Sequence, residues 1–204
     1  MDPGVVPESD LRSAISRNLD RFERRASPRP LIPAAVAVVL LEADDGPSLP
    51  IFQRTLGMRR HAGQMALPGG KVQAGEEAQD CAIRELLEEL GLAVDHSEVL
   101  GTLDDFDTRS GFTITPVVVW SGAGAATLRP SASEVGELYL IGMPELRGAV
   151  ASARPGESAS FSLRLPRVEV FAPTGAILYQ FSEVALDGRS CRVADFYQPL
   201  FTHR

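Results

Sequence analysis

The apolar residues of this chain are spaced as in a protein that mixes helices and strands. Residues 34–42 (AAVAVVLLE) form a continuous apolar run, short enough for a central strand that is buried on both faces. Residues 49–53 should pair with this strand across the polar turn DDGPS. Near the N-terminus, residues 8–25 are predicted to be an amphipathic helix, because apolar side chains recur at helical spacing: Leu11, Ile15, Leu19 and Phe22.

The second half of the chain continues this pattern. Apolar and β-branched runs predict strands over residues 99–105, 113–120 and 137–141, a short helix over 144–150, and strand-like alternation over 161–170. Asp187 and Gly188 then stand between two runs that read as strands, which predicts a C-terminal β-hairpin. This hairpin would extend an edge of the sheet, form a dimer contact or form one wall of a lid.

Residues 70–92 (GKVQAGEEAQDCAIRELLEELGL) carry the strongest chemical signal. Each helical residue advances by about 100°, so Glu85, Glu88 and Glu89 fall within an arc of about 100° on one face. Gly91 is a suitable stop, because glycine adopts the left-handed conformation after a last helical turn at little cost. The opposite face should pack against the protein through its apolar residues: Ile83, Leu86, Leu87 and Leu90.

Three glutamates on one helix face repel one another unless a counter-charge is present. A hard divalent cation would reverse this, and magnesium prefers oxygen ligands such as carboxylates and phosphates. By themselves, three glutamates are also typical of an ordinary solvated helix face. The residues around them favour the metal site.

Gly70 is followed after five residues by Glu76, and then after seven by Arg84-Glu85-Leu86, Glu88-Glu89 and Gly91-Leu92. This series resembles the signature box of the Nudix hydrolase superfamily. The resemblance implies an α/β/α sandwich with a mixed sheet, and cleavage of a diphosphate linkage with Mg²⁺ or Mn²⁺ as cofactor. It implies metal ligands at Glu85, Glu88, Glu89 and the Gly69 carbonyl. It also implies a structural Gly70 and a pairing of Glu76 with Arg84 that holds the loop against the helix.

A basic segment lies immediately upstream of this box. Arg54, Arg59, Arg60 and His61 place three fixed positive charges and one titratable ring within eight residues, an arrangement that suits phosphate oxygens or an ordinary solvated turn. Their spacing resembles the motif that precedes the box in coenzyme A pyrophosphatases, which release adenosine 3′,5′-bisphosphate and 4′-phosphopantetheine. The resemblance implies substrate contacts at Arg54, Arg59 and His61. Thr55 and Leu67 depart from that motif.

The reaction needs a base that takes a proton from the attacking water. Glu88 is one candidate. Glu134 and Glu137 are two others, because the superfamily often brings its base or last ligand from a distant loop. Both also fit ordinary surface acids beside a strand.

Composition narrows the remaining alternatives. We expect a helical extension over residues 1–30 and one Nudix domain over 31–204. The expected substrate is a small molecule that contains a diphosphate, and the C-terminal element could join two copies into a homodimer. A net charge of −7 argues against nucleic acid as a partner. The two cysteines lack a zinc-site spacing, and no signal peptide or membrane span is evident, which predicts a cytoplasmic protein without a membrane partner. Substrates such as ADP-ribose, and a non-catalytic nucleotide sensor, remain as alternatives.

Overall fold

The computed structural model describes residues 8–57, 62–156 and 160–199. The helices of these ranges are α1 Glu8–Arg21, α2 Ala78–Leu90, α3 Met143–Ser152 and α4 Thr174–Gln180, with the short turns η1 His96–Glu98, η2 Ala125–Thr127 and η3 Phe181–Leu186. The strands are β1 Ile32–Glu42, β2 Ser48–Arg54, β3 Met65–Ala66, β4 Gly69–Lys71, β5 Val99–Thr102, β6 Phe106–Asp107, β7 Phe112–Gly124, β8 Val135–Gly142, β9 Ser162–Arg164 and β10 Glu169–Phe171. Within the same ranges, every helix is too short or too polar to cross a membrane.

A mixed sheet organises the molecule. Strands β1 and β7 run parallel at its centre, with Val38 opposite Val118, and the order across the sheet is β3-β2-β1-β7-β5. The other pairings are antiparallel: β4 joins β1, β6 joins β7 and β8 joins β2. Strands β9 and β10 form a separate two-stranded sheet.

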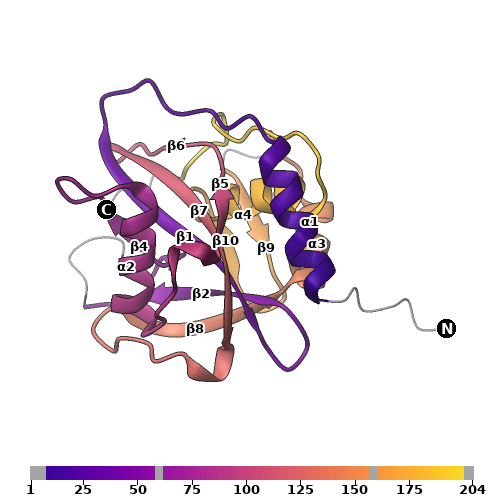
Figure 1. Ribbon diagram of the computed structural model, residues 1–204. Helices are drawn as coiled ribbons and strands as arrows, with labels where there is room; N and C mark the ends of the chain where they lie inside the picture. Colours follow the sequence, from indigo (N-terminus) through magenta and orange to yellow (C-terminus); the bar gives the residue numbers. More distant parts are fainter. Residues whose placement is uncertain (1–7, 58–61, 157–159, 200–204) are drawn as a thin grey trace.

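Strand β1 is buried on both faces, as its apolar run predicts. Its side chains alternate between two cores: Ala37 and Val39 pack on the α2 side, while Val38 and Leu40 pack on the other. Helix α2 covers the first face, and α1, α3 and α4 cover the second (Figure 1). The prediction of an α/β/α sandwich with an added N-terminal helix is therefore confirmed.

The N-terminal helix is shorter than predicted, because it ends at Arg21 rather than at residue 25. Beyond it the chain runs along the loop between β5 and β6 and takes its hydrogen bonds from that loop. The Arg24 Nε donates to the Leu103 carbonyl at 3.1 Å, and the Arg25 backbone N–H donates to the Asp104 carboxylate at 2.7 Å. These long-range bonds replace the next turn of helix.

The predicted C-terminal β-hairpin is wrong. Residues 174–186 form α4 followed by the π-helical turn η3, and no strand follows Leu186 in the described part of the chain. The buried residues Ile177, Phe181 and Val184 recur at helical rather than strand spacing. Gly188, with φ of 64°, donates its N–H to the Val184 carbonyl, so the Asp-Gly pair ends a helix instead of forming a hairpin turn.

The Asp104 carboxylate bonds to residues near both ends of the chain and so holds them against the sheet. Only 6% of this residue is exposed, and its carboxylate accepts hydrogen bonds from the Arg25 backbone N–H, from Gln180 Nε2 at 2.9 Å and from Arg192 Nη1 at 2.8 and 3.0 Å. The Arg192 guanidinium also lies over the Phe22 ring, 4.5 Å from its centroid. One buried carboxylate thus joins the residues after α1, the loop before β6, α4 and the C-terminal tail.

Candidate active site

Helix α2 is rotated so that part of its acidic face points into the protein. Glu89 is 1% exposed and lies among the buried residues of the helix, whereas Leu87, which the sequence pattern places in the packed face, is 55% exposed. The helix ends at Gly91, whose φ of 64° is left-handed and whose N–H donates to the Leu87 carbonyl. The acidic face is therefore partly an interior surface that lies against the loop before the helix.

Glu89 is a buried carboxylate with few compensating partners. Its Oε2 accepts a 2.9 Å hydrogen bond from the Gly69 backbone N–H, and its Oε1 lies 3.6 Å from Arg54 Nη1. Burial raises the pKa of Glu89 to about 8, against the opposing effects of the Gly69 hydrogen bond and the Arg54 charge. An additional positive charge beside this carboxylate would favour its ionised form.

Arg84 holds the loop before α2 against the helix. Its Nε and Nη2 donate to the two oxygens of Glu76 at 2.8 and 3.1 Å, and its Nη1 donates to Glu85 at 2.7 Å and to Glu88 at 3.1 Å. The hydrogen bonds from Arg84 lower the pKa of Glu76, while burial raises that of Glu85. One guanidinium thus connects Glu76 in the loop with two of the three glutamates on the helix.

Two glycines allow strand β4 to approach both its neighbours. A Cβ at Gly69 would overlap the Ala35 carbonyl oxygen in β1, and a Cβ at Gly70 would overlap the carboxylate of Glu85. Cys81 Sγ packs against the same loop, 3.6 Å from the Gly70 carbonyl oxygen, and burial raises the pKa of this thiol to about 11. The close approach brings the backbone of Gly69 within hydrogen-bonding distance of Glu89.

The two distant candidates for a base lie in different settings. Glu134 is half-buried in the loop before β8, and its charge contributes to raising the pKa of both Glu85 and Glu89, so it lies on their side of the site. This loop is joined to α2 by a 2.8 Å hydrogen bond from the Ser131 N–H to the Glu89 carbonyl. Glu137 is exposed on β8, and its carboxylate raises the pKa of the Tyr139 hydroxyl.

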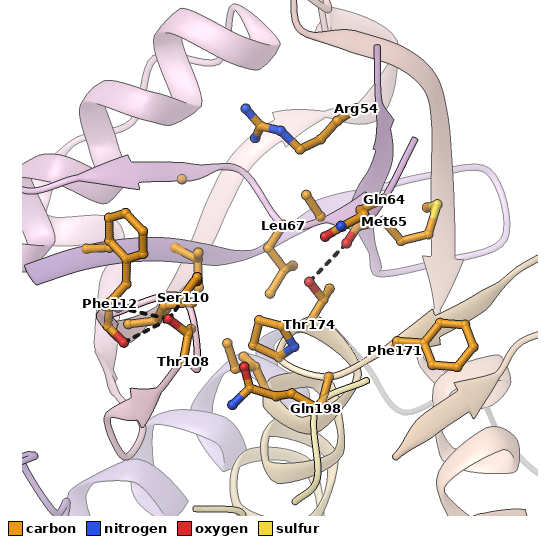
Figure 2. Close-up of a pocket in the computed structure, with 18 of the residues that line it drawn as sticks. Arg54, Gln64, Met65, Leu67, Thr108, Ser110, Phe112, Phe171, Thr174 and Gln198 are labelled. Carbon is orange, nitrogen blue, oxygen red and sulfur yellow. Dashed lines mark hydrogen bonds between the residues drawn. The ribbon is translucent and has the colours of Figure 1, made fainter. Parts of the chain in front are cut away.

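A cavity of about 1,210 Å³ opens beside these carboxylates, and Arg54, Gly69 and Gly70 belong to its lining. Figure 2 shows Arg54 at one side of the cavity, with Thr174 and Gln198 opposite it. The lining combines β1, β3, β4 and β7 with residues from the C-terminal part of the chain, among them Val168, Pro173, Thr174 and Gln198. Sequence reasoning missed these C-terminal residues, because no local motif marks them and only the fold brings them to the cavity.

Of the predicted substrate contacts, Arg54 alone lies in the described part of the chain; Arg59 and His61 lie outside the described residues. Arg54 stands between the carboxylate site and the cavity: Nη1 faces Glu89, and the residue lines the cavity. Its Nε is buried and has no hydrogen-bond partner among the described residues. Among the described residues, this donor is therefore left unsatisfied.

The predicted ligands fit a hard divalent cation by their chemistry, because every side-chain donor is a carboxylate oxygen. In the part of the chain that the structure describes, the cationic partner of the buried Glu89 is Arg54, 3.6 Å away. In the described ranges, however, no three acidic, cysteine or histidine side chains are grouped so that they could hold an ion. Arg84 instead engages Glu85 and Glu88, while Glu89 faces Gly69 and Arg54. An incoming cation would compete with Arg84 for two of its ligands.

The raised pKa of Glu89 predicts a pH-dependent stability in the metal-free protein. The folded pKa of about 8 lies above the ordinary value of 4.5, so the folded state binds more protons than the unfolded state between these values. The contribution of Glu89 to the free energy of unfolding should therefore be most favourable below about pH 4.5. It should fall as the pH rises towards 8, by up to about 1.4 kcal/mol per pH unit. Thermal unfolding in EDTA at a series of pH values measures this slope.

Glu89→Gln is the matched variant for that measurement, since it keeps the shape of the side chain and cannot ionise. Its slope between pH 5 and 8 should be shallower than that of the unsubstituted protein. Equal slopes in the two proteins would show that Glu89 titrates normally in the folded state.

Comparison with known proteins identifies relatives of the chain. The profile of the NUDIX domain family matches residues 31–157. An uncharacterized Nudix hydrolase, NudL, from Pectobacterium atrosepticum is 34% identical over 139 residues, which cover 65% of this chain and 71% of that protein. The protein of the same name from Citrobacter koseri is 41% identical over 73 residues, covering 35% of this chain and 38% of the relative. Among solved structures, an Ap4A hydrolase from C. elegans has 16% identity and a TM-score of 0.49, covering 73% of this chain and 95% of that one, and nothing about substrate follows from this likeness.

Proposed function

This chain belongs to the NUDIX domain family, and on that premise we propose that it hydrolyses the diphosphate linkage of coenzyme A or its derivatives. The products would be adenosine 3′,5′-bisphosphate and 4′-phosphopantetheine. The position of Arg54 carries the proposal, because this residue faces the buried Glu89 on one side and lines the cavity on the other. A diphosphate bound at Arg54 would therefore lie between the carboxylates and a space large enough for the rest of the substrate.

In this proposal Glu85, Glu88, Glu89 and the Gly69 carbonyl would hold Mg²⁺ or Mn²⁺. The bound cation would neutralise the charge of the diphosphate and lower the pKa of the attacking water. Arg84 positions the acidic helix face through Glu76, Glu85 and Glu88. Arg54 would donate hydrogen bonds to diphosphate oxygens, as the motif shared with coenzyme A pyrophosphatases implies for Arg54, Arg59 and His61.

We assign the general base to Glu134 rather than to Glu137. The charge of Glu134 acts on both Glu85 and Glu89, and its loop is hydrogen-bonded to the backbone of α2. Glu137 is exposed, and its carboxylate acts on the Tyr139 hydroxyl, whose pKa it raises. Glu88 is also less suited to this role, because it accepts a hydrogen bond from Arg84 at 3.1 Å.

The variants Glu134→Gln and Glu137→Gln test this assignment as a matched pair. We expect Glu134→Gln to lower kcat by about a hundredfold or more, because a general base contributes roughly 10²–10⁴ to the rate. Glu137→Gln should change kcat by much less. Steady-state kinetics over a range of pH would measure both, and a larger loss of kcat in Glu137→Gln would reverse the assignment.

The proposed activity is tested by incubating the purified protein with coenzyme A, ADP-ribose and diadenosine polyphosphates, each with Mg²⁺, with Mn²⁺ or with EDTA. Mass spectrometry should identify adenosine 3′,5′-bisphosphate and 4′-phosphopantetheine from coenzyme A, and only where a metal is present. Running the reaction in H₂¹⁸O places the label in one of the two products and so identifies the phosphorus that water attacks. Faster turnover of ADP-ribose than of coenzyme A would contradict the substrate assignment while leaving hydrolysis in place.

A further inference from the structure

The C-terminal part of the chain forms one side of the cavity. We propose that this side selects the substrate, by receiving the uncharged arm that is joined to the diphosphate; this inference rests on the proposed function. We call this side the C-terminal wall and define it by the lining residues Val168, Phe171, Pro173, Thr174, Ile177 and Gln198. All of these residues lie beyond residue 157, where the match to the family profile ends. The family profile therefore does not cover these residues.

The wall is fixed to the sheet by specific contacts. Thr174 Oγ1 donates a 3.1 Å hydrogen bond to the Met65 carbonyl in β3 (Figure 2). At Gly175, a Cβ would overlap the Val170 carbonyl oxygen, so α4 packs directly on the backbone of β10. Gln198 accepts from the Arg109 N–H at 3.1 Å and donates to the Asp107 carbonyl at 2.9 Å. These bonds hold the wall in place against β3 and the residues before β7.

Charge is distributed unevenly around the cavity. Among the described residues of the lining, the cationic side chains are Arg54 and Lys71, which come from β2 and β4, close to the proposed catalytic loop. Next to the wall, the charged lining residue is Glu169, whose Oε1 accepts from Ser162 Oγ at 2.7 Å and lies 3.4 Å from Arg164 Nε. Arg164 offsets the charge of Glu169, so an arm that carried a phosphate or carboxylate would meet no free cationic side chain among the described residues of the wall, and mainly apolar surface.

The remaining surface of the wall suits a neutral arm. The half-buried Val168, Phe171 and Pro173 offer apolar surface, and the buried Ile177 packs behind them. The Gln198 amide is already engaged by the Arg109 N–H and the Asp107 carbonyl, so the wall offers mainly apolar contact. The cavity volume of about 1,210 Å³ exceeds the roughly 300–1,000 Å³ typical of small-molecule sites, so an extended arm fits as well as the diphosphate. An arm of the pantetheine type, which is uncharged and contains two amides, matches this surface better than a sugar, whose hydroxyls need many hydrogen-bond partners.

Binding of pantetheine, which has the arm without any phosphate, tests the wall directly and needs neither metal nor turnover. Val168 is suited to substitution because it is half-buried and its backbone bonds to Leu165 do not involve its side chain. The measurement is calorimetric titration of the full chain with pantetheine under reducing conditions. We expect the Kd to rise about tenfold or more in Val168→Asp, which adds a charge to the wall, and in Val168→Trp, which fills the space beside it. The conservative Val168→Ile should bind within about threefold of the unsubstituted protein.

The outcomes separate this inference from the proposed function. If coenzyme A is hydrolysed but pantetheine does not bind, or binds all four proteins equally, the wall inference is overturned and the proposed function stands. If coenzyme A is not hydrolysed, the proposed function fails, and the wall inference is then decided by the same pantetheine measurement. Thermal unfolding checks that each variant is folded. If Val168→Asp does not fold, the test is made with Val168→Trp. A selective rise in KM for coenzyme A relative to ADP-ribose in Val168→Asp would further support the wall as the selecting element.

Discussion

Replacing Glu89 with glutamine is expected to lower metal-dependent turnover by about a hundredfold or more at saturating substrate. Glutamine keeps the size of the side chain but removes the charge that would hold the cation. Among the described residues, the buried Glu89 carboxylate has the Gly69 N–H and the more distant Arg54 to balance its charge, so a bound cation would stabilise this carboxylate strongly. Initial rates with Mg²⁺ and Mn²⁺, together with calorimetric titration of each metal, would measure the loss.

Glu23→Gln is a suitable control for this substitution, since it makes the same chemical change on an exposed residue remote from α2. The control should keep its turnover and its metal affinity. In the metal-free state at pH 8, Glu89→Gln should be more stable than the unsubstituted protein, because the cost of burying an ionised carboxylate is removed. A variant that was stable, folded and fully active would exclude Glu89 from the metal site.

Replacing Asp104 with alanine is expected to reduce the free energy of unfolding by about 3–5 kcal/mol. The substitution leaves Arg192, Gln180 Nε2 and the Arg25 N–H without their common acceptor in a largely buried position. Because these groups belong to three separate parts of the chain, the loss should appear as a lower midpoint and not as fraying of one end. Denaturant unfolding followed by circular dichroism measures the change.

Two further variants calibrate this result. Asp104→Asn keeps an acceptor in place and should lose less stability than the alanine variant. Arg164→Ala removes an exposed ion pair with Glu169, in which the arginine side chain is 87% exposed, and should cost about 0–1 kcal/mol. If Asp104→Ala cost no more than Arg164→Ala, the carboxylate would not join the ends of the chain.

The central features of the fold could be predicted from the sequence because they depend on local patterns. The continuous apolar run at 34–42 indicated a strand buried on both faces, and β1 places its side chains alternately in two cores. The spacing of Glu85, Glu88 and Glu89 placed them on one helix face. Spacing could not show how that helix is rotated against the sheet, and Leu87 is exposed while Glu89 is buried.

The C-terminal region was harder to predict, because its structure is decided by distant partners. Asp187 and Gly188 occur both in hairpin turns and at helix ends, and here Gly188 closes a helix by donating its N–H to Val184. Thr174 reaches the cavity through a hydrogen bond to Met65, a residue 109 positions away. Contacts over such separations leave no periodic signal in one sequence, so the cavity lining could not be predicted.

Arg54 has a consequence for how ligands influence one another. A phosphate anion that draws the guanidinium towards the cavity would weaken its attraction to Glu89, and that carboxylate would then attract a dication more strongly. Thermodynamic linkage makes the effect mutual, so the cation should likewise tighten the binding of the anion. Saturation with both ligands would thus be cooperative, although each occupies its own part of the site.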